Sequence, residues 1–196
     1  MGVNLAKNQP VSKQQIVGRK HIVLASSSPR RLELMNSLGS LSFTQLPSTG
    51  DEVNEGGGRT DIVCGSDSVE ILGKPKDGED AVRMLQKLSG STHMVGTGYC
   101  IGSLRFFPRA RFDCQPLLLR ACISRVTFRE LSMREITEYV ASGSPLDKAG
   151  AYGIQEEGGD FVDSLDGSIS NVMGLPIAEL GLDLVRFGIA TFAAEN

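Results

Sequence analysis

Apolar runs and segments of helical period alternate along the N-terminal part of the chain. Residues 21–24 form an apolar run that predicts a strand, and the spacing that follows predicts a helix over residues 30–38. Ser28 has the hydroxyl that an N-cap needs, Pro29 suits the first helical position, and Gly39 can end the helix in a left-handed conformation. The predicted order is therefore strand, serine-rich turn and helix, and such a turn commonly holds a ligand. The predicted buried stripe of the helix is Leu34, Met35 and Leu38.

Three further helices are predicted from the same kind of pattern. The first follows Asp77 and carries apolar residues at i, i+3, i+4 and i+7. The second begins with a capping box between Ser132 and Glu135 and stops before Gly143, and the third starts at Ile177. The predicted buried positions are Ala81, Met84, Leu85 and Leu88 in the first and Ile136, Tyr139 and Val140 in the second.

The remaining pattern predicts strands and turns. Strands are expected over residues 61–67, 92–101 and 124–131, whereas the glycine-rich stretch 147–176 predicts close-packed turns and short strands. Residues 102–122 mix prolines, arginines and aromatic residues without a clean period, so no structure is predicted for them.

Length and composition indicate one globular domain. With 196 residues, 40% hydrophobic residues, 22% charged residues and a mean hydropathy of -0.06, the chain has room for one sizeable core. Residues 1–20 have no apolar signal core and are expected to be a flexible polar leader, with a single domain over residues 21–196. No apolar run approaches a transmembrane span, so no membrane partner is expected.

The net charge and the cysteine content limit the kind of ligand site and the cellular compartment that we expect. A net charge of -3 argues against a surface that binds nucleic acid as a whole, so any phosphate site must be local. The four cysteines form no CxxC pair and have no nearby histidine pair, which indicates reduced, buried thiols and favours the cytoplasm.

Two arginines stand at the start of the first predicted helix, where a cation is unfavourable. Arg30 and Arg31 lie beside the positive end of the helix dipole, at a cost of roughly 0.3–1 kcal/mol. A bound anion would reverse that sign, because backbone N–H groups, the hydroxyls of residues 26–28 and two guanidinium groups would converge on phosphate oxygens. The alternative is a solvated basic helix start.

Several segments resemble the Maf family of nucleoside triphosphate pyrophosphatases, in the family's order. They are "LASSSPRRLELM", "PSTGDE", "GSDSV", "LGKPKDGEDAVRMLQKLSGSTH", "VTFREL", "DKAGAYGIQ" and "GSISNVMGLP". The resemblance implies an α/β fold of the inosine triphosphate pyrophosphatase type, with a mixed twisted sheet, flanking helices and two lobes around a central cleft. It also implies hydrolysis of a nucleotide to its monophosphate and pyrophosphate, a divalent cation, and a homodimer.

Within that family, the chain looks like the branch that acts on dTTP and UTP. The carrying features are the arginine pair of "SPRR", an Asp-Ser pair at the acidic motif and "KAGAYGIQ". The branch that acts on 7-methyl-GTP tends to have Tyr-Arg after the proline and Asp-Gln at the acidic motif, and this sequence has neither. The expected substrates are therefore dTTP and UTP, together with modified pyrimidine nucleotides.

The expected site residues fall into two groups. Attack on an α-phosphorus requires neutralised phosphate charge, an activated water and a stabilised leaving group. Ser26, Arg30 and Arg31 would hold phosphate, Lys74 would add a catalytic charge, and the resemblance places Lys148 and Gln155 at the same cleft. Glu52 and Asp67 would hold Mg²⁺, with Mn²⁺ or Co²⁺ as alternatives, and Asp67 would also orient the attacking water. Taken alone, these acids and lysines would be solvated surface or turn residues.

Three stretches depart from the family pattern. The segments 52–67 and 67–74 are shorter than usual, and the first lacks a helix with its own lysine. Residues 102–122 do not resemble the family.

These departures support a second hypothesis. In it, the chain is a catalytically weak nucleotide-binding protein that acts through partners in cell division, as the family's association with septum formation suggests. A kinase is disfavoured because the chain has no GxxxxGK[ST] loop.

Overall fold

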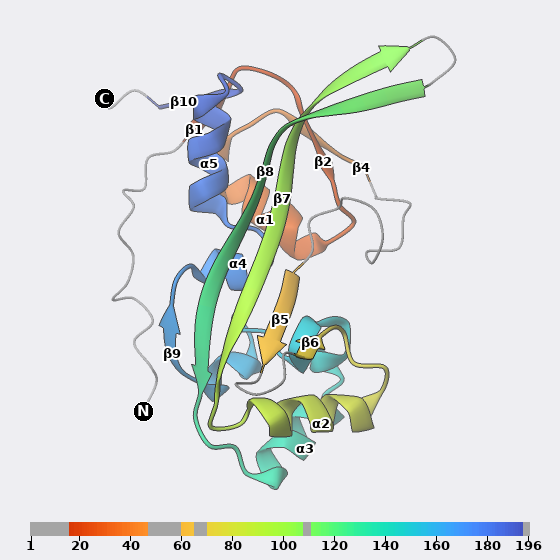
Figure 1. Cartoon of the computed structure of the whole chain (residues 1–196), viewed down its shortest axis with the longest axis vertical. Helices are drawn as coiled ribbons and strands as arrows, with labels where there is room; N and C mark the ends of the chain where they lie inside the picture. The colour runs from red at the N-terminus through yellow and green to blue at the C-terminus, as the bar shows by residue number, and fades with distance from the viewer. Residues whose placement is uncertain (1–15, 47–59, 65–69, 108–110, 194–196) are drawn as a thin grey trace.

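The chain is described by a computed structural model that covers residues 16–46, 60–64, 70–107 and 111–193 (Figure 1). Its strands are divided over three sheets, and its helices pack between and beside them. This arrangement confirms the predicted α/β class. Parallel and antiparallel pairs both occur, as expected of a mixed fold, but in the described residues they are divided between one large antiparallel sheet and two small sheets.

The largest sheet is antiparallel throughout, with the strand order β6-β5-β7-β8-β9. Its central pair, β7 and β8, is a long two-stranded ribbon (Figure 1). The ribbon runs along both halves of the molecule, which are the parts built around its two hydrophobic clusters. The strands are β5 (Thr60–Cys64), β6 (Glu70–Leu72), β7 (Thr92–Phe107), β8 (Arg111–Phe128) and β9 (Val162–Asp166).

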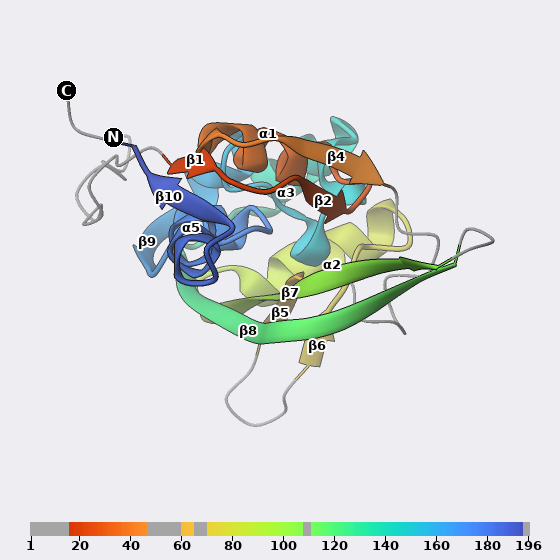
Figure 2. The ribbon, with the colours of Figure 1, turned by 90° about the horizontal axis from the view of Figure 1, so that it is seen from above.

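The first hydrophobic cluster lies where α2 (Gly78–Leu88) and α3 (Met133–Ala141) pack together beside one end of the ribbon. Both helices begin as the sequence predicted, with Asp77 as the N-cap of α2 and the Ser132/Glu135 capping box on α3. Figure 2 shows that the helices lie on one side of the ribbon. Four short helices complete this region: η2 (Ser144–Asp147), η3 (Ala149–Ala151), η4 (Glu157–Phe161) and α4 (Ile169–Val172).

The second hydrophobic cluster lies around α1 (Pro29–Ser37) and α5 (Ile177–Arg186). The ribbon contributes to both clusters, because Val95 of β7 belongs to the first and Tyr99 to the second. Small sheets surround the second cluster. They consist of β1 (Ile16–Gly18), β3 (Gly39–Ser40) and β10 (Ala190–Phe192), and of the parallel pair β2 (Ile22–Ala25) and β4 (Phe43–Leu46).

Three sequence-based expectations change. Residues 16–20 belong to the fold and not to a leader, because Ile16 is buried and β1 pairs with both β3 and β10; residues 1–15 lie outside the described residues. Within 102–122, the described residues continue β7 and β8 as paired strands. Cys100 is exposed, so the expectation that the cysteines are buried is wrong for it. Among the residues that the structure covers, no helix is long and apolar enough to cross a membrane.

Candidate functional site

The start of α1 is built as the sequence predicted. Ser28 is the N-cap, its Oγ accepts the backbone N–H of Arg31 at 3.5 Å, and Pro29 occupies the first turn. The helix buries Leu34 and Met35 against the second cluster. Gly39 follows with a positive φ of 131°, and a Cβ there would overlap the carbonyl oxygen of Ile16. The two ends of α1 are therefore fixed by local chemistry.

Arg31 anchors the serine turn from within the protein. Its Nε donates to the carbonyl oxygen of Gly174 at 2.9 Å, and its Nη1 donates to Ser26 Oγ at 3.3 Å. Ser26 is buried, its Oγ also accepts the N–H of Ser28 at 3.2 Å, and its carbonyl oxygen accepts from Gln45 Nε2 at 2.7 Å. Because two donors already fill the acceptor positions of Oγ, the hydroxyl of Ser26 can act toward a ligand only as a donor. Arg31 is thus a positioning residue for Ser26.

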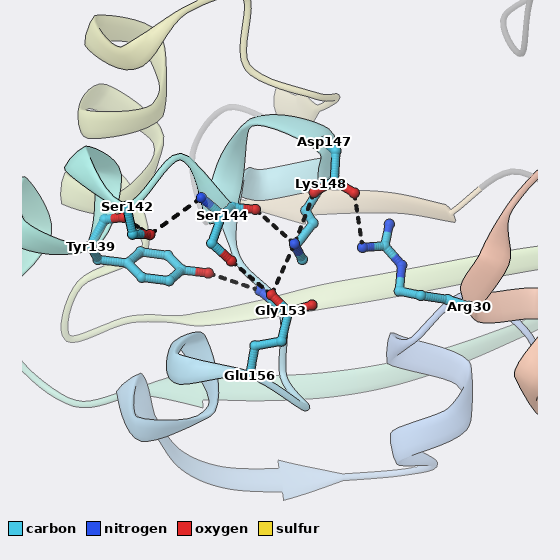
Figure 3. A network of polar contacts seen from close by, with 8 residues as sticks. All are labelled: Arg30, Tyr139, Ser142, Ser144, Asp147, Lys148, Gly153 and Glu156. Atoms are coloured by element: carbon cyan, nitrogen blue, oxygen red, sulfur yellow. Dashed lines mark hydrogen bonds and ion pairs between the residues drawn. The ribbon is translucent and has the colours of Figure 1, made fainter.

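Arg30 points to the other half of the molecule. Its Nη1 donates to Asp147 Oδ2 at 3.4 Å, across from α1 to the end of η2 (Figure 3). The two residues are 117 positions apart in sequence and come from segments beside different hydrophobic clusters. A cation of the predicted phosphate site therefore lies where the two halves meet.

Lys148 lies beside the same carboxylate. Its Nζ donates to Ser144 O at 2.7 Å and Asp147 Oδ1 at 2.8 Å, and it lies 2.9 Å from Glu156 Oε2 (Figure 3). Its side chain is only 8% exposed. Burial on its own would lower the pKa of Lys148, but hydrogen bonds to Asp147 and Glu156 outweigh burial and raise that pKa above its ordinary value. Lys148 is therefore held charged.

The two carboxyl groups around Lys148 are held ionised by the same contacts. Burial works against ionisation of Asp147 and Glu156, but hydrogen bonds from Lys148 outweigh it, so the pKa of each carboxyl lies below its ordinary value. Ser144 Oγ donates a further hydrogen bond to Glu156 Oε2 at 2.8 Å. The result is a compact set of two cations and two anions.

The backbone around Lys148 leaves room for its side chain. A Cβ at Gly153 would lie 2.7 Å from Lys148 Cε, which real contacts essentially never allow. The N–H of Gly153 donates to the hydroxyl of Tyr139 at 3.3 Å, which fixes the turn to α3. Gly150 and Ala151 both have positive φ, 68° and 59°, and for Ala151 this is an uncommon conformation. The "KAGAYGIQ" segment is therefore shaped to enclose one lysine.

Two other predicted residues lie near this segment. The carbonyl oxygen of Gly73 accepts the N–H of Gly150 at 3.0 Å, which places the turn of Lys74 beside η3. Gln155 is exposed and immediately precedes Glu156. Glu52 and Asp67, the predicted metal ligands, lie outside the described residues. Within the part of the chain that the structure describes, no group of three or more acidic, histidine or cysteine residues could hold a metal ion.

Sequence reasoning missed Asp147 and Glu156. A signal for them was available, because both acids directly flank the segment that carries Lys148 and Gln155. An open hollow of about 600 Å³ between α2 and α3, lined partly by Asp77 and Glu79, contains none of the predicted site residues and is not the site.

Comparisons with known proteins identify similar sequences. The family model described as "Maf-like protein" matches residues 55–187. The curated dTTP/UTP pyrophosphatase of Geobacter metallireducens is 42% identical over 195 residues, covering 85% of this chain and 96% of the relative. The dTTP/UTP pyrophosphatase of Aquifex aeolicus is 38% identical over 184 residues, covering 81% of this chain and 91% of the relative.

Proposed function

The chain belongs to the Maf family, and from that premise we propose that it hydrolyses dTTP and UTP to the nucleoside monophosphate and pyrophosphate. The observation that carries the proposal is the meeting of Arg30 and Lys148 at Asp147, which gathers cations from both halves of the molecule. The two relatives are both named dTTP/UTP pyrophosphatase, which supports the choice of substrate. Modified pyrimidine nucleotides are included in the proposed substrate class.

The residues divide the work of binding a triphosphate. Arg30 offers a guanidinium group to phosphate oxygens, and Lys148 and Lys74 offer point charges. The buried hydroxyl of Ser26 donates a hydrogen bond, while Arg31 holds that serine in place. In the reaction, water oxygen bonds to the α-phosphorus, the bond from that phosphorus to the bridging oxygen breaks, and pyrophosphate leaves with its charge neutralised by these cations.

A divalent cation is part of the proposal, with Glu52 and Asp67 as its ligands. Mg²⁺ is the first choice, with Mn²⁺ or Co²⁺ as alternatives, and when bound it would supply charge neutralisation and lower the pKa of a water. We expect a chelator to abolish turnover and added Mg²⁺ to restore it. Asp67→Asn should remove turnover while leaving the thermal transition unchanged.

We also propose that the protein is a cytoplasmic homodimer. An exposed apolar face on the large sheet supports the dimer, since Leu119 and Ile123 of β8 lie on it side by side with the small residues of β7. We expect no nucleic acid partner, because the net charge is -3.

The test is a product assay with Mg²⁺ and each of dTTP, UTP, CTP, ATP, GTP and 7-methyl-GTP, in which pyrophosphate and orthophosphate are measured separately. We expect pyrophosphate from dTTP and UTP. Arg30→Ala should lower kcat/KM by at least about tenfold, because a hydrogen bond to a charged group is lost. Arg125→Ala is the matched control, since Arg125 also pairs with an exposed aspartate at 3.4 Å but lies away from the site.

A folded protein that releases no pyrophosphate from any of these nucleotides would overturn the proposal. If that protein still bound dTTP or UTP, the second hypothesis would replace it: a nucleotide-binding protein that acts through partners in cell division.

A further inference from the structure

The ammonium group of Lys148 has no donor left for a ligand in this structure. A lysine ammonium carries three N–H groups, and Lys148 Nζ has three oxygen partners at 2.7, 2.8 and 2.9 Å. Its side chain is almost fully buried, so water cannot replace a lost partner freely. A phosphate oxygen can therefore bind Lys148 only if one of the three partners leaves.

Asp147 is the partner that can leave. Its side chain is 69% exposed, and its second oxygen makes only a long contact of 3.4 Å with Arg30. Glu156 is less exposed, at 36%, and is also held by Ser144 Oγ. The third partner is the backbone carbonyl of Ser144, which moves only with the chain. Rotation of one exposed side chain thus frees two cations together.

Asp147 also has the geometry of a bound phosphate. Its Oδ1 contacts Lys148 Nζ and its Oδ2 contacts Arg30 Nη1, so the carboxylate bridges two cations from opposite halves of the molecule (Figure 3). Two oxygens of one phosphate group make the same kind of bridge. The carboxylate marks the position at which a phosphate would satisfy both cations.

We propose that Asp147 is a placeholder anion, which occupies the phosphate position between Arg30 and Lys148 in the free protein and is displaced when the polyphosphate of the substrate binds. This inference rests on the proposed function, because it takes Arg30 and Lys148 as phosphate ligands. In the free protein, the negative charge of Asp147 offsets the repulsion between Arg30 and Lys148. After phosphate has displaced Asp147, Glu156 still holds Lys148 in place. The cost of displacing Asp147 is subtracted from the affinity for phosphate.

The test measures the binding of inorganic pyrophosphate by calorimetry, without turnover. Asp147→Asn removes the competing charge but keeps an oxygen that can accept from Lys148, so it should bind pyrophosphate about two- to tenfold more tightly than the wild type. Asp166→Asn is the matched control, because Asp166 pairs with Arg125 at the same 3.4 Å on the exposed edge of the sheet. Its affinity should equal that of the wild type.

A second comparison separates a placeholder from a structural residue. In an Arg30→Ala background, Asp147→Asn should increase the affinity for pyrophosphate much less than it does in the wild type. The reason is that Arg30, one of the two cations that Asp147 would otherwise occupy, is already absent. If Asp147 only supported the fold around Lys148, the single variant Asp147→Asn would bind pyrophosphate as the wild type does or more weakly. That result would overturn the proposal. Asp147→Ser serves as a second variant if Asp147→Asn lowers the thermal transition.

The two proposals fail in different ways. If the wild type binds pyrophosphate but cleaves no nucleotide, the proposed reaction is wrong. The role of Asp147 as a placeholder is then decided by the pyrophosphate affinities of the Asp147 variants alone. If dTTP and UTP are cleaved but Asp147→Asn neither tightens pyrophosphate binding nor lowers KM, the placeholder is wrong and the reaction stands.

Discussion

Gly153 leaves the space that the side chain of Lys148 occupies, and a substitution there tests whether the position of this lysine matters for binding. A Cβ at this position would lie 2.7 Å from Lys148 Cε and 3.0 Å from Cδ. Gly153→Ala should therefore displace the lysine and raise KM for dTTP about tenfold or more, because a hydrogen bond to a charged group is misplaced. The measurement is steady-state kinetics alongside thermal unfolding.

Gly78→Ala is the control for that variant. A Cβ on Gly78 meets only Val140 Cγ1, at an ordinary 3.5 Å, and the residue is at the start of α2. Its kinetics should match the wild type. Unchanged KM in Gly153→Ala would show that the enclosure of Lys148 has no role in binding.

His93 makes the stability depend on pH. It is buried against Phe128 and Tyr152, and burial lowers its pKa from 6.5 to about 4. The folded protein keeps this imidazole neutral, whereas the unfolded chain takes up a proton below about pH 6.5. Stability should therefore be constant above pH 6.5 on this account and fall by about 3 kcal/mol as the pH drops to 4.

Urea unfolding at a series of pH values checks this prediction. In His93→Gln the corresponding part of the decline should be absent, because no group titrates at that position. A variant with the same pH dependence as the wild type would show that other groups cause the decline.

At the residue scale, the sequence predicts which residues cap the first helix, but it does not predict which residues Arg30 and Arg31 contact. Arg30 and Arg31 are adjacent and looked equivalent, yet successive helical residues point about 100° apart, so Arg31 turns inward to Gly174 and Arg30 turns across to Asp147. The capping roles of Ser28 and Pro29 are local, and they were predictable. The contact of Arg30 joins residues 117 positions apart, and no local pattern reports it.

At the scale of elements, the sequence predicts strands over residues 92–101 and 124–131, but it does not predict that β7 and β8 continue as a paired ribbon between them. Its described inner side chains include Val95 in the first cluster and Tyr99 in the second. Beyond the bulge between Ile101 and Gly102, the two strands continue as cross-strand pairs, and backbone pairing of this kind requires no hydrophobic period in the sequence. The helices, in contrast, have caps and apolar stripes that can be read locally: the N-caps are confirmed for α1, α2 and α3 and the buried stripe for α2, whereas Leu38 and Val140 are only partly buried.

The outer part of the ribbon should be dispensable. Joining Gly102 to Pro116 by an Asn-Gly turn removes the strands beyond the bulge and keeps the paired core residues. We expect the melting temperature to stay within a few degrees and kcat/KM for dTTP to be unchanged. Thermal unfolding and the product assay check this. Loss of folding on truncation would show that this part supports the core.

At the scale of the whole molecule, one face of the large sheet lacks a helical cover among the described residues (Figure 2). Leu119 is 74% exposed on it, and Ile123 and Met94 are exposed beside it. Gly98, opposite Ala121, leaves a shallow strip, since a Cβ there would meet only the carbonyl oxygen of Arg120 at 3.9 Å. This exposed apolar face is the one on which we propose that the second copy of the chain binds.

Light scattering after size exclusion tests the dimer. The wild type should have the mass of two chains, and Ile123→Lys should have the mass of one, because a charge cannot be buried in an apolar interface. Leu182→Lys, at an exposed leucine of α5, should remain dimeric. A monomeric wild type would contradict the proposed dimer.

Arg30 and Lys148 come from the two halves of the molecule and meet at Asp147, where we propose that the triphosphate of dTTP binds and is cleaved. The most direct measurement is hydrolysis of dTTP in ¹⁸O-labelled water with Mg²⁺, followed by mass spectrometry of the products. Attack at the α-phosphorus predicts one ¹⁸O atom in dTMP and none in pyrophosphate. Labelled orthophosphate, or label in pyrophosphate, would contradict the account, because water would then have attacked a different phosphorus.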